Sequence, residues 1–296
     1  MTGVLLIDKP SGPTSHDVVA RIRRATRERG IGHTGTLDPR ASGLLPLVLG
    51  KATRLASLLS GSDKTYEATV CLGVNTDTDD ADGVPLGEPV ATLPDDAAVD
   101  LALESFRGEI AQIPPAHSAK RIGGKKAYEL ARRAEPVALA PVTVTVRSLD
   151  RLARDGDRVE LRVTASAGFY VRALARDLGA RLGCGAHLAA LRRTRSGHFD
   201  VAAAISLEAA EQLGAGLEDR LIRAEDALPH LPSVRLTAAG LTKVSHGNPI
   251  GPEHLEGGWV PPATAPGPVK ILGPAGGLAA LGHSRGGLVH PFVVLV

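Results

Sequence analysis

Alternating and helically spaced apolar positions predict a mixed set of strands and helices in the first two thirds of the chain. Residues 66–73, 142–149 and 158–166 are rich in Val, Thr and Leu, and apolar and polar side chains alternate in the last run from Val159 to Thr164. A period of two is typical of a strand with one buried face. We therefore expect strands in these three segments.

Two helices are predicted beside these strands. After the turn at KPSGPTS, Thr14 or Ser15 can cap a helix with one apolar face. A second apolar stripe follows Gly168 and ends at Gly183, directly after the strand predicted at 158–166. Because strands and helices do not alternate in a sustained rhythm, the sequence favours an α+β fold over a doubly wound parallel sheet.

Glycine and proline content divides the chain near residue 231. Residues 231–296 hold 12 Gly and 9 Pro, against 22 and 12 in residues 1–230. Short apolar runs between these Gly and Pro clusters predict short strands joined by turns. We expect a first domain over residues 1–230 and a small β-rich domain over residues 231–296.

Charge is nearly balanced overall but segregated along the chain. Lys and Arg number 34 against 32 Asp and Glu, so a polyanion would have to bind local basic patches. Residues 75–109 carry ten acidic groups and one basic group, whereas residues 117–135 carry six basic and two acidic groups. We expect the first segment to repel phosphate and the second to attract it, which favours nucleic-acid binding.

Targeting signals and cysteines suggest a reducing compartment. No apolar run approaches the roughly 18 residues that a membrane span requires, and the first residues do not read as a secretion signal. Two cysteines, Cys71 and Cys184, cannot form a disulfide framework. We expect a cytoplasmic protein without membrane attachment.

Three motifs that could indicate a cofactor or metal lack the required context. Gly30–Gly35 matches the dinucleotide pattern G-x-G-x-x-G, but it follows a predicted basic helix rather than a strand. Asp77–Gly83 resembles a calcium loop, yet in register it lacks the first carboxylate and the final Glu, so a turn with Asx hydrogen bonds is expected. Cys184 and His187 supply only two soft ligands. We expect neither metal nor cofactor.

One aspartate stands out among tight turns. Asp38 precedes Pro39 within the otherwise apolar stretch His33–Gly50. From the residues alone, it is either a turn or helix-cap aspartate, or a nucleophile held on a loop beside the core. Contact with Arg172 of the second predicted helix would keep the carboxylate ionised and favour the second interpretation.

Six sequence blocks resemble the TruB family of tRNA pseudouridine-55 synthases in their order and approximate spacing. They span residues 3 to about 200 and read GVLLIDKPSGPTSHDVV, GHTGTLDPRASGLLPLVLGKATR, DKTYEATVCLG, TDTDDADG, GFYVRALARDLG and GCGAHLAALRRTRSG. The resemblance implies a pseudouridine-synthase-like mixed sheet with flanking helices. Residues 231–296 resemble, in position and strand-like composition, the PUA RNA-binding module that often ends such proteins.

The family resemblance implies an activity and a catalytic group. The enzyme would flip uridine-55 out of the tRNA T loop, break its N1–C1′ bond and rejoin the base through C5, without metal or cofactor. By similarity, Asp38 is the nucleophile, attacking either C6 of the base or C1′ of the sugar. Tyr66 would stack on the base as a candidate acid or base, and Arg172 would position Asp38. Taken alone, Tyr66 could equally be a core aromatic and Arg172 a surface residue.

The resemblance also implies residues that hold the RNA. His33 would insert into the T loop, Lys9 would support the cleft, and Tyr170 is a further substrate contact. A mobile RNA-gripping segment over about 111–135 supplies the other candidates, which are Lys120, Arg121, Lys125 and Lys126. Relative to the family pattern, the sequence gains a charge at Lys120 and loses one at Ala167, which affects the expected RNA grip rather than the chemistry.

We expect one partner, the T arm of tRNA, and a monomeric protein. The alternative function from a different class is a non-catalytic tRNA-binding or RNA-folding protein that keeps the basic segment. Asp38, Tyr66 and Arg172 together favour the enzyme, because binding alone needs no buried nucleophile.

Overall fold

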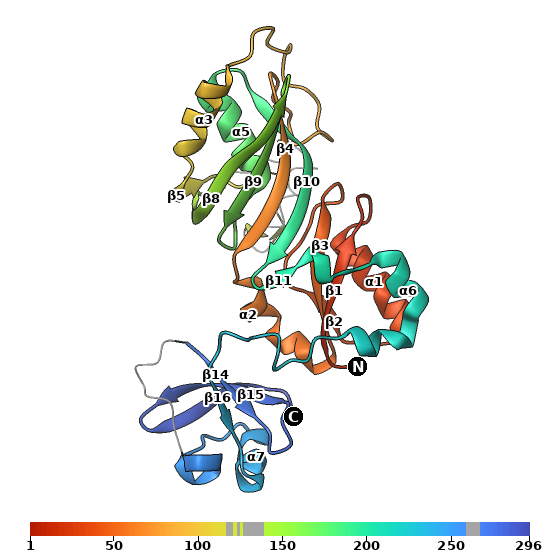
Figure 1. Ribbon diagram of the computed structural model, residues 1–296, viewed down its shortest axis with the longest axis vertical. Coiled ribbons are helices and arrows are strands. Elements are labelled where there is room, and N and C mark those ends of the chain that lie inside the picture. Colours follow the sequence, from red (N-terminus) through yellow and green to blue (C-terminus); the bar gives the residue numbers. More distant parts are fainter. Residues whose placement is uncertain (117–120, 123–124, 127–138, 259–266) are drawn as a thin grey trace.

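The computed structural model describes residues 1–116, 121–122, 125–126, 139–258 and 267–296, with one large and one smaller sheet (Figure 1). The large sheet runs β12-β1-β3-β10-β4-β9-β8-β5, with β2 against β3 and β11 against β10. Its strands are β1 (Gly3–Lys9), β2 (Ile31–His33), β3 (Ser42–Leu49), β4 (Lys64–Leu72), β5 (Gly108–Gln112), β8 (Val142–Asp155), β9 (Arg158–Ala165), β10 (Ala186–Ser196), β11 (Phe199–Asp200) and β12 (Ile205–Ser206).

Helices flank both halves of this sheet. They are α1 (Ser15–Thr26), α2 (Ala56–Ser60), α3 (Asp96–Glu104), α5 (Val171–Leu182) and α6 (Leu207–Leu213), with 3-10 turns η1 (Gly50–Leu55), η2 (Val201–Ala203) and η3 (Gly214–Arg220). Helices α3 and α5 pack on the half formed by β4, β8 and β9, whereas α1 and α6 pack beside β1 (Figure 1). The architecture is therefore the α+β fold with a mixed sheet that the sequence predicts.

The three predicted strands are confirmed as antiparallel neighbours. Strands β4, β9 and β8 lie side by side, with Tyr66 opposite Val163 and Val163 opposite Leu149. β8 continues beyond the predicted segment to Asp155, because its second half pairs with the start of β9 in a hairpin.

Both predicted helices are confirmed together with their end signals. At the start of α1 the Thr14 hydroxyl accepts a hydrogen bond from the Asp17 amide at 3.0 Å, and the Asp17 carboxylate accepts one from the Thr14 amide at 2.8 Å. This reciprocal pair satisfies two backbone donors that a helix start leaves free. Helix α5 ends at Gly183 in the left-handed region, with φ 73°, where glycine pays no Cβ penalty.

A second sheet occupies the end of the chain. It runs β13-β14-β15-β16 and consists of β13 (Ser233–Arg235), β14 (Val269–Leu272), β15 (Leu278–Arg285) and β16 (Leu288–Val294), with α7 (Ala238–Ser245), η4 (Pro252–His254) and η5 (Glu256–Gly258) beside it. Leu281 and Leu295 pack in the same apolar cluster as Val4 and Leu6 of β1. The described part of residues 231–296 is thus β-rich as expected. It has its own apolar cluster and joins the first part of the chain through a second one.

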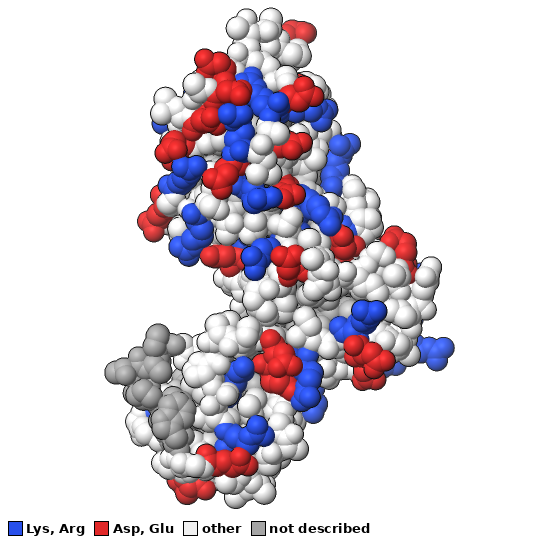
Figure 2. Space-filling model, viewed as in Figure 1, with Lys and Arg blue, Asp and Glu red and all other residues white. Residues whose placement is uncertain are grey.

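The acidic segment does not form the separate repelling face that the sequence suggested. Asp96 and Asp100 of α3 pair with Arg151 of β8 at 2.9 and 2.7 Å, and Asp96 also pairs with Arg154 at 3.0 Å. Figure 2 accordingly shows acidic and basic side chains intermixed over the half of the molecule that holds the large sheet. Folding neutralises charges that are segregated along the chain.

Among the helices of the described residues, none has the length and apolar character needed to cross a membrane.

Candidate active site

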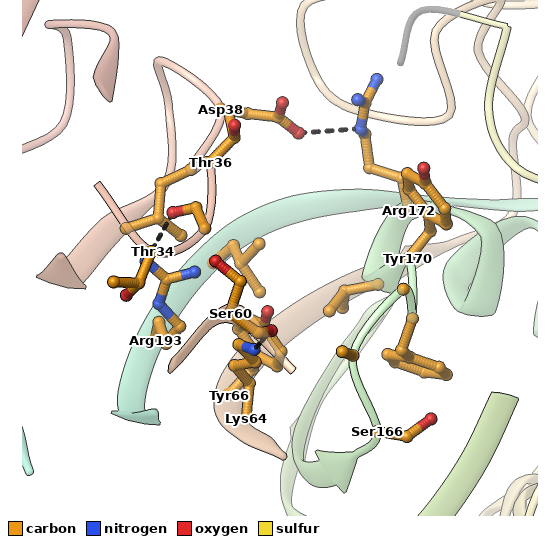
Figure 3. Close-up of a pocket in the computed structure, with 17 residues that line it drawn as sticks. Thr34, Thr36, Asp38, Ser60, Lys64, Tyr66, Ser166, Tyr170, Arg172 and Arg193 are labelled. Carbon is orange, nitrogen blue, oxygen red and sulfur yellow. Dashed lines mark hydrogen bonds and ion pairs between the residues drawn. The ribbon is translucent and has the colours of Figure 1, made fainter. Parts of the chain in front are cut away.

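A cavity of about 280 Å³ opens where β4, β10, the start of α5 and the loop after β2 meet. Figure 3 shows Asp38 and Arg172 on one side of it, and Tyr66, Lys64 and Arg193 on another. Its lining residues are Thr34, Gly35, Thr36, Leu37, Asp38, Ser60, Lys64, Tyr66, Ser166, Ala167, Gly168, Phe169, Tyr170, Val171, Arg172, Leu191 and Arg193. The volume is that of a small polar molecule such as one nucleoside, and the lining combines aromatic and apolar walls with charged groups.

Asp38 and Arg172, 134 positions apart in the sequence, form an ion pair across this cavity. The Arg172 Nε lies 3.0 Å from the Asp38 Oδ2 (Figure 3). The Arg172 side chain is 8% exposed, whereas that of Asp38 is 44% exposed because it faces the open cavity. The contact that the sequence made a condition of the nucleophile interpretation is present.

The acidic loop supplies a second carboxylate to the same arginine. The Nη1 of Arg172 lies 3.4 Å from the Asp80 Oδ2 and donates a hydrogen bond to the Thr78 carbonyl at 3.2 Å. As expected for an Asx turn, the Asp80 carboxylate accepts a hydrogen bond from the Asp82 amide at 3.1 Å. Asp80 was not among the predicted site residues, although it lies in the TDTDDADG block of the family resemblance.

Opposing influences act on the pKa of the Asp38 carboxyl. Desolvation raises the pKa of the Asp38 carboxyl above its ordinary value, Arg172 and Lys9 oppose this rise, and Asp80 adds to it. The ionising influence of Arg172 is the one expected from the sequence. The structure adds the repulsion between Asp38 and Asp80, the two carboxylates that share this guanidinium.

Lys9 lies beneath the nucleophile loop rather than on an RNA-facing surface. Its side chain is fully buried, and its ammonium group donates to the carbonyls of Pro10, Pro13 and Pro39 at 2.9, 2.8 and 3.1 Å. Desolvation lowers the pKa of Lys9 to about 8, although Asp38 opposes the shift. Lys9 therefore ties the KPSGP turn to the residue that follows Asp38.

Tyr66 and Tyr170 both line the cavity, from different elements. Tyr66 is half-buried on β4, and Tyr170 is the residue before α5. The buried Gln112 of β5 donates to the Tyr170 carbonyl at 2.9 Å and accepts from its amide at 2.8 Å. Gln112 thereby anchors the start of the helix that carries Arg172, a role that no sequence pattern indicated.

His33 lies at the end of β2, beside the cavity residue Thr34. Its ring meets the ring of His16 edge-on, with centroids 5.4 Å apart. Burial lowers the pKa of His33, with smaller contributions from His16 and Arg193. The lowered pKa favours the neutral ring, as suits a group that packs against apolar or aromatic surfaces.

The predicted RNA-gripping segment is only partly described. Arg121–Ile122 and Lys125–Lys126 form the two-stranded antiparallel ladder of β6 and β7. Lys120, like the expected mobility of the segment, lies outside the described residues.

The glycine motif at Gly30–Gly35 lacks the structural context of a dinucleotide site. Gly30 and Gly32 belong to or precede β2, which is followed by a loop and not by the helix that dinucleotide binding requires. In the part of the chain that the structure describes, no group of three or more His, Cys, Asp or Glu side chains is arranged to hold a metal ion.

Sequence comparison identifies the class of protein that carries this fold and site. Residues 23–171 match the family model described as TruB family pseudouridylate synthase (N terminal domain). Residues 172–228 match the one described as tRNA pseudouridylate synthase B C-terminal domain. The protein is thus a pseudouridine synthase.

Curated relatives narrow this class to one family. A tRNA pseudouridine synthase B of Solibacter usitatus is 43% identical over 300 residues, covering all of both chains. That of Thermobifida fusca is 43% identical over 302 residues, covering 99% of this chain and 98% of the relative. That of Azoarcus sp. is 47% identical over 250 residues, covering 84% and 83%. The chain belongs to the TruB family.

Solved structures agree with this assignment. One from a Cbf5-Nop10-Gar1 complex matches with a TM-score of 0.75 and 30% identity, covering all of this chain and 85% of that one. One from an H/ACA RNP bound to a substrate RNA containing 2′-deoxyuridine matches with a TM-score of 0.74 and 28% identity, again covering 100% and 85%.

Proposed function

We propose that this protein isomerises uridine-55 in the T loop of tRNA to pseudouridine, with Asp38 as nucleophile and without metal or cofactor. The C1′–N1 bond breaks, a C1′–C5 bond forms, the C5 hydrogen leaves as a proton and N1 gains one. Atoms and electrons balance within the nucleotide, so the reaction needs no redox partner. The tRNA substrate implies action in the cytoplasm, and we expect the protein to act as a monomer.

One observation carries the proposal: the ion pair of Asp38 and Arg172 borders a cavity of about 280 Å³ that also contains Tyr66. A carboxylate held by a guanidinium at the mouth of a pocket can attack either C6 or C1′ of an inserted nucleotide. A phenol ring on the pocket wall can stack on the base and exchange a proton with C5 or N1. These are the parts that the isomerisation requires.

We assign the RNA contacts to residues of four parts of the chain. His33 and Tyr170 would hold the flipped nucleotide and its neighbours, and Lys9 would act as a positioning residue beneath Asp38. The basic segment with Lys120, Arg121, Lys125 and Lys126 would grip the backbone of the T arm, and residues 231–296 would add a PUA-like RNA-binding surface.

Replacing the nucleophile tests the proposal. The wild-type protein is incubated with a tRNA transcript carrying tritium at C5 of uridine, and release of tritium to solvent is followed beside mapping of pseudouridine. We expect release and pseudouridine at position 55 with wild type, and loss of both with Asp38→Asn. tRNA affinity should stay within a few-fold, because the substitution removes one charge without changing the shape of the loop.

A non-catalytic tRNA-binding protein would give a different result in the same experiment. Wild-type protein that binds tRNA but releases no tritium would support it. Unchanged turnover by Asp38→Asn would instead retain an enzyme and reject the assigned nucleophile.

A further inference from the structure

Two buried cations line the cavity away from the Asp38–Arg172 pair. Lys64 of β4 and Arg193 of β10 are 6% and 1% exposed, and both contribute to the cavity wall. Figure 3 shows Arg193 beside Thr34, at the base of the loop that carries Asp38, and Lys64 beside Tyr66. Neither was predicted as a site residue, and the ion pair described above involves neither.

Their only bonded partners in the described part of the chain are neutral carbonyl groups. Arg193 donates from Nε to the Leu44 carbonyl at 2.7 Å and from Nη2 to the Gly35 carbonyl at 3.1 Å. Lys64 donates to the carbonyls of Ser62, at 2.6 Å, and Ser60. Within the described residues, no carboxylate lies within ion-pair distance of either cation, whereas Arg172 has two.

The two cations also lie close to each other. A Cβ placed on Gly35 would be 3.5 Å from the Arg193 Nη1 and 3.9 Å from the Lys64 Cε. Burial lowers the pKa of Lys64 to about 8, and repulsion by Arg193 contributes to the shift. Asp63 opposes this shift of the Lys64 pKa, but it is not within ion-pair distance of Lys64. Two positive charges without an ion-pair partner in one buried corner cost stability, and an anion or a strongly polarised oxygen would offset that cost.

The sheet sets which part of a bound nucleotide meets this corner. Lys64 precedes Tyr66 by two positions on β4, and Arg193 follows Leu191 by two positions on the neighbouring β10. Since side chains two apart on a strand share a face, all four point to the cavity side of the sheet. A pyrimidine that packs on Tyr66 and Leu191 can place its carbonyl edge against the two cations.

We propose that Lys64 and Arg193 bind the O2 and O4 carbonyl oxygens of the target uracil and stabilise the negative charge that forms there during the reaction. When the C1′–N1 bond breaks, its electron pair remains on the base and delocalises onto these oxygens. Attack at C6 places charge on O4 in the same way. The bond from Asp38 to C6 or C1′ breaks as C5 bonds to C1′. Loss of the C5 proton leaves negative charge on the base again, and protonation of N1 then removes it. This assignment rests on the proposed isomerisation.

A backbone phosphate is the other anion that two cations could bind. Both side chains are nine-tenths buried or more, and the strand and loop carbonyls that they hold close this corner from solvent. A phosphodiester continues into the chain at both ends and therefore stays at the pocket mouth, whereas a flipped base enters the pocket completely. The geometry favours the base.

Single-turnover kinetics of Lys64→Met test the proposal. With tRNA at saturation, we expect the isomerisation rate to fall about 100-fold, as when one charge-stabilising donor is removed from an active site. tRNA Kd and its salt slope should stay unchanged. Lys64→Arg, which keeps the charge, should recover part of the rate. Arg162→Met is the matched control, since it removes an exposed cation from the outer face of the adjacent β9 and should keep the wild-type rate.

Each remaining outcome has one meaning. A normal rate with weakened binding and a smaller salt slope would assign the corner to phosphate and overturn the proposal. An unchanged rate and unchanged binding would show that the corner is not used, while the isomerase itself stands. Arg193→Lys supplies a second test if Lys64→Met melts at a lower temperature. Wild-type protein that forms no pseudouridine would overturn the proposed function and this inference together.

Discussion

Arg172 is the residue on which the site geometry depends, because it holds Asp38 through Nε and Asp80 through Nη1 at the same time. Asp80→Asn should lower turnover about 10- to 100-fold, since a loosened guanidinium misplaces Asp38. Removing the like charge should also lower the pKa of Asp38, so the acidic limb of the kcat/KM profile should move to lower pH. A pH series of initial rates measures both effects.

Asp82→Asn is the control for this substitution, because Asp82 belongs to the same loop but pairs with Arg40 at the surface. We expect it to change turnover less than twofold. An Asp80→Asn protein with the wild-type rate and wild-type acidic limb would contradict the bridging role of Arg172.

Lys9 should make the stability of the protein depend on pH in the alkaline range. Its pKa is about 8 in the folded protein, against 10.5 for an unperturbed lysine. Between these values the unfolded chain binds a proton that the folded chain has lost, so the free energy of unfolding rises with pH. From pH 7 to 10 this contribution grows by about 2 kcal/mol.

Urea unfolding of wild type and Lys9→Met across this range isolates the contribution, because Lys64 titrates equally in both proteins. The difference in unfolding free energy, wild type minus variant, should increase as pH rises through 8. A difference that stays constant would show that Lys9 is not desolvated as the structure indicates.

At this scale the sequence led to the proposed catalytic residues but not to the residues that support them. Asp38, Tyr66 and Arg172 follow from motifs of the family resemblance, and all three line one cavity. Asp80 and Gln112 were missed, because each acts on a segment distant in the chain. Composition and periodicity do not show which distant residues contact each other.

Helix α5 contains Gly179 at a position where helix propensity alone would favour alanine. A Cβ on Gly179 would lie closer than 3.0 Å to backbone atoms of Gly185 and Ala186, where the chain turns from α5 into β10. Alanine favours helix by about 1 kcal/mol over glycine. Gly179→Ala should nevertheless destabilise the protein by about 1–3 kcal/mol, because the clash is with backbone that cannot rotate away.

The neighbouring Ala180 provides the comparison, since it is exposed on the same helix. Ala180→Gly should cost about 1 kcal/mol by propensity alone. Thermal unfolding of both variants then compares the stability lost to the backbone clash with the stability lost to lower helix propensity. A Gly179→Ala protein more stable than wild type would refute the close approach of α5 and β10.

Periodicity predicts elements with one buried face and misses those buried on both. β4, β8, β9, α1 and α5 show the expected period and were anticipated. β1 and β3 were not, because side chains on both of their faces are buried. Val4 and Leu6 pack in one apolar cluster while Leu5 and Ile7 pack in another. A strand of this kind appears in the sequence as a short apolar run without alternation.

For the whole molecule, the change in Gly and Pro content near residue 231 indicated where a second part of the chain begins. It did not indicate how the two parts are joined. The second sheet begins at Ser233, close to that boundary. Composition could not show that β15 and β1 share apolar contacts, because those residues lie more than 270 positions apart. The second sheet has an apolar cluster of its own, which includes Val234, Ile271 and Val289. A different cluster joins it to β1.

This shared cluster predicts that the two parts unfold together. Leu281 of β15 is fully buried in the cluster that contains Val4 of β1, so Leu281→Ala should destabilise both parts by about 2–5 kcal/mol. Calorimetry should show one transition in wild type and one transition, at lower temperature, in the variant. Hydrogen exchange should become faster at the β1 amides, even though the substitution lies in the other sheet.

Leu288→Ala serves as the reference, because Leu288 is 37% exposed at the start of β16 and its loss should shift the melting temperature little. Two calorimetric transitions, of which Leu281→Ala moves only one, would mean that the second sheet folds independently. Protection of the β1 amides would then stay as in wild type. A single transition with faster β1 exchange would instead mean that residues 231–296 stabilise β1. Because Lys9, the last residue of β1, lies under the loop that carries Asp38, this would couple the end of the chain to the candidate active site.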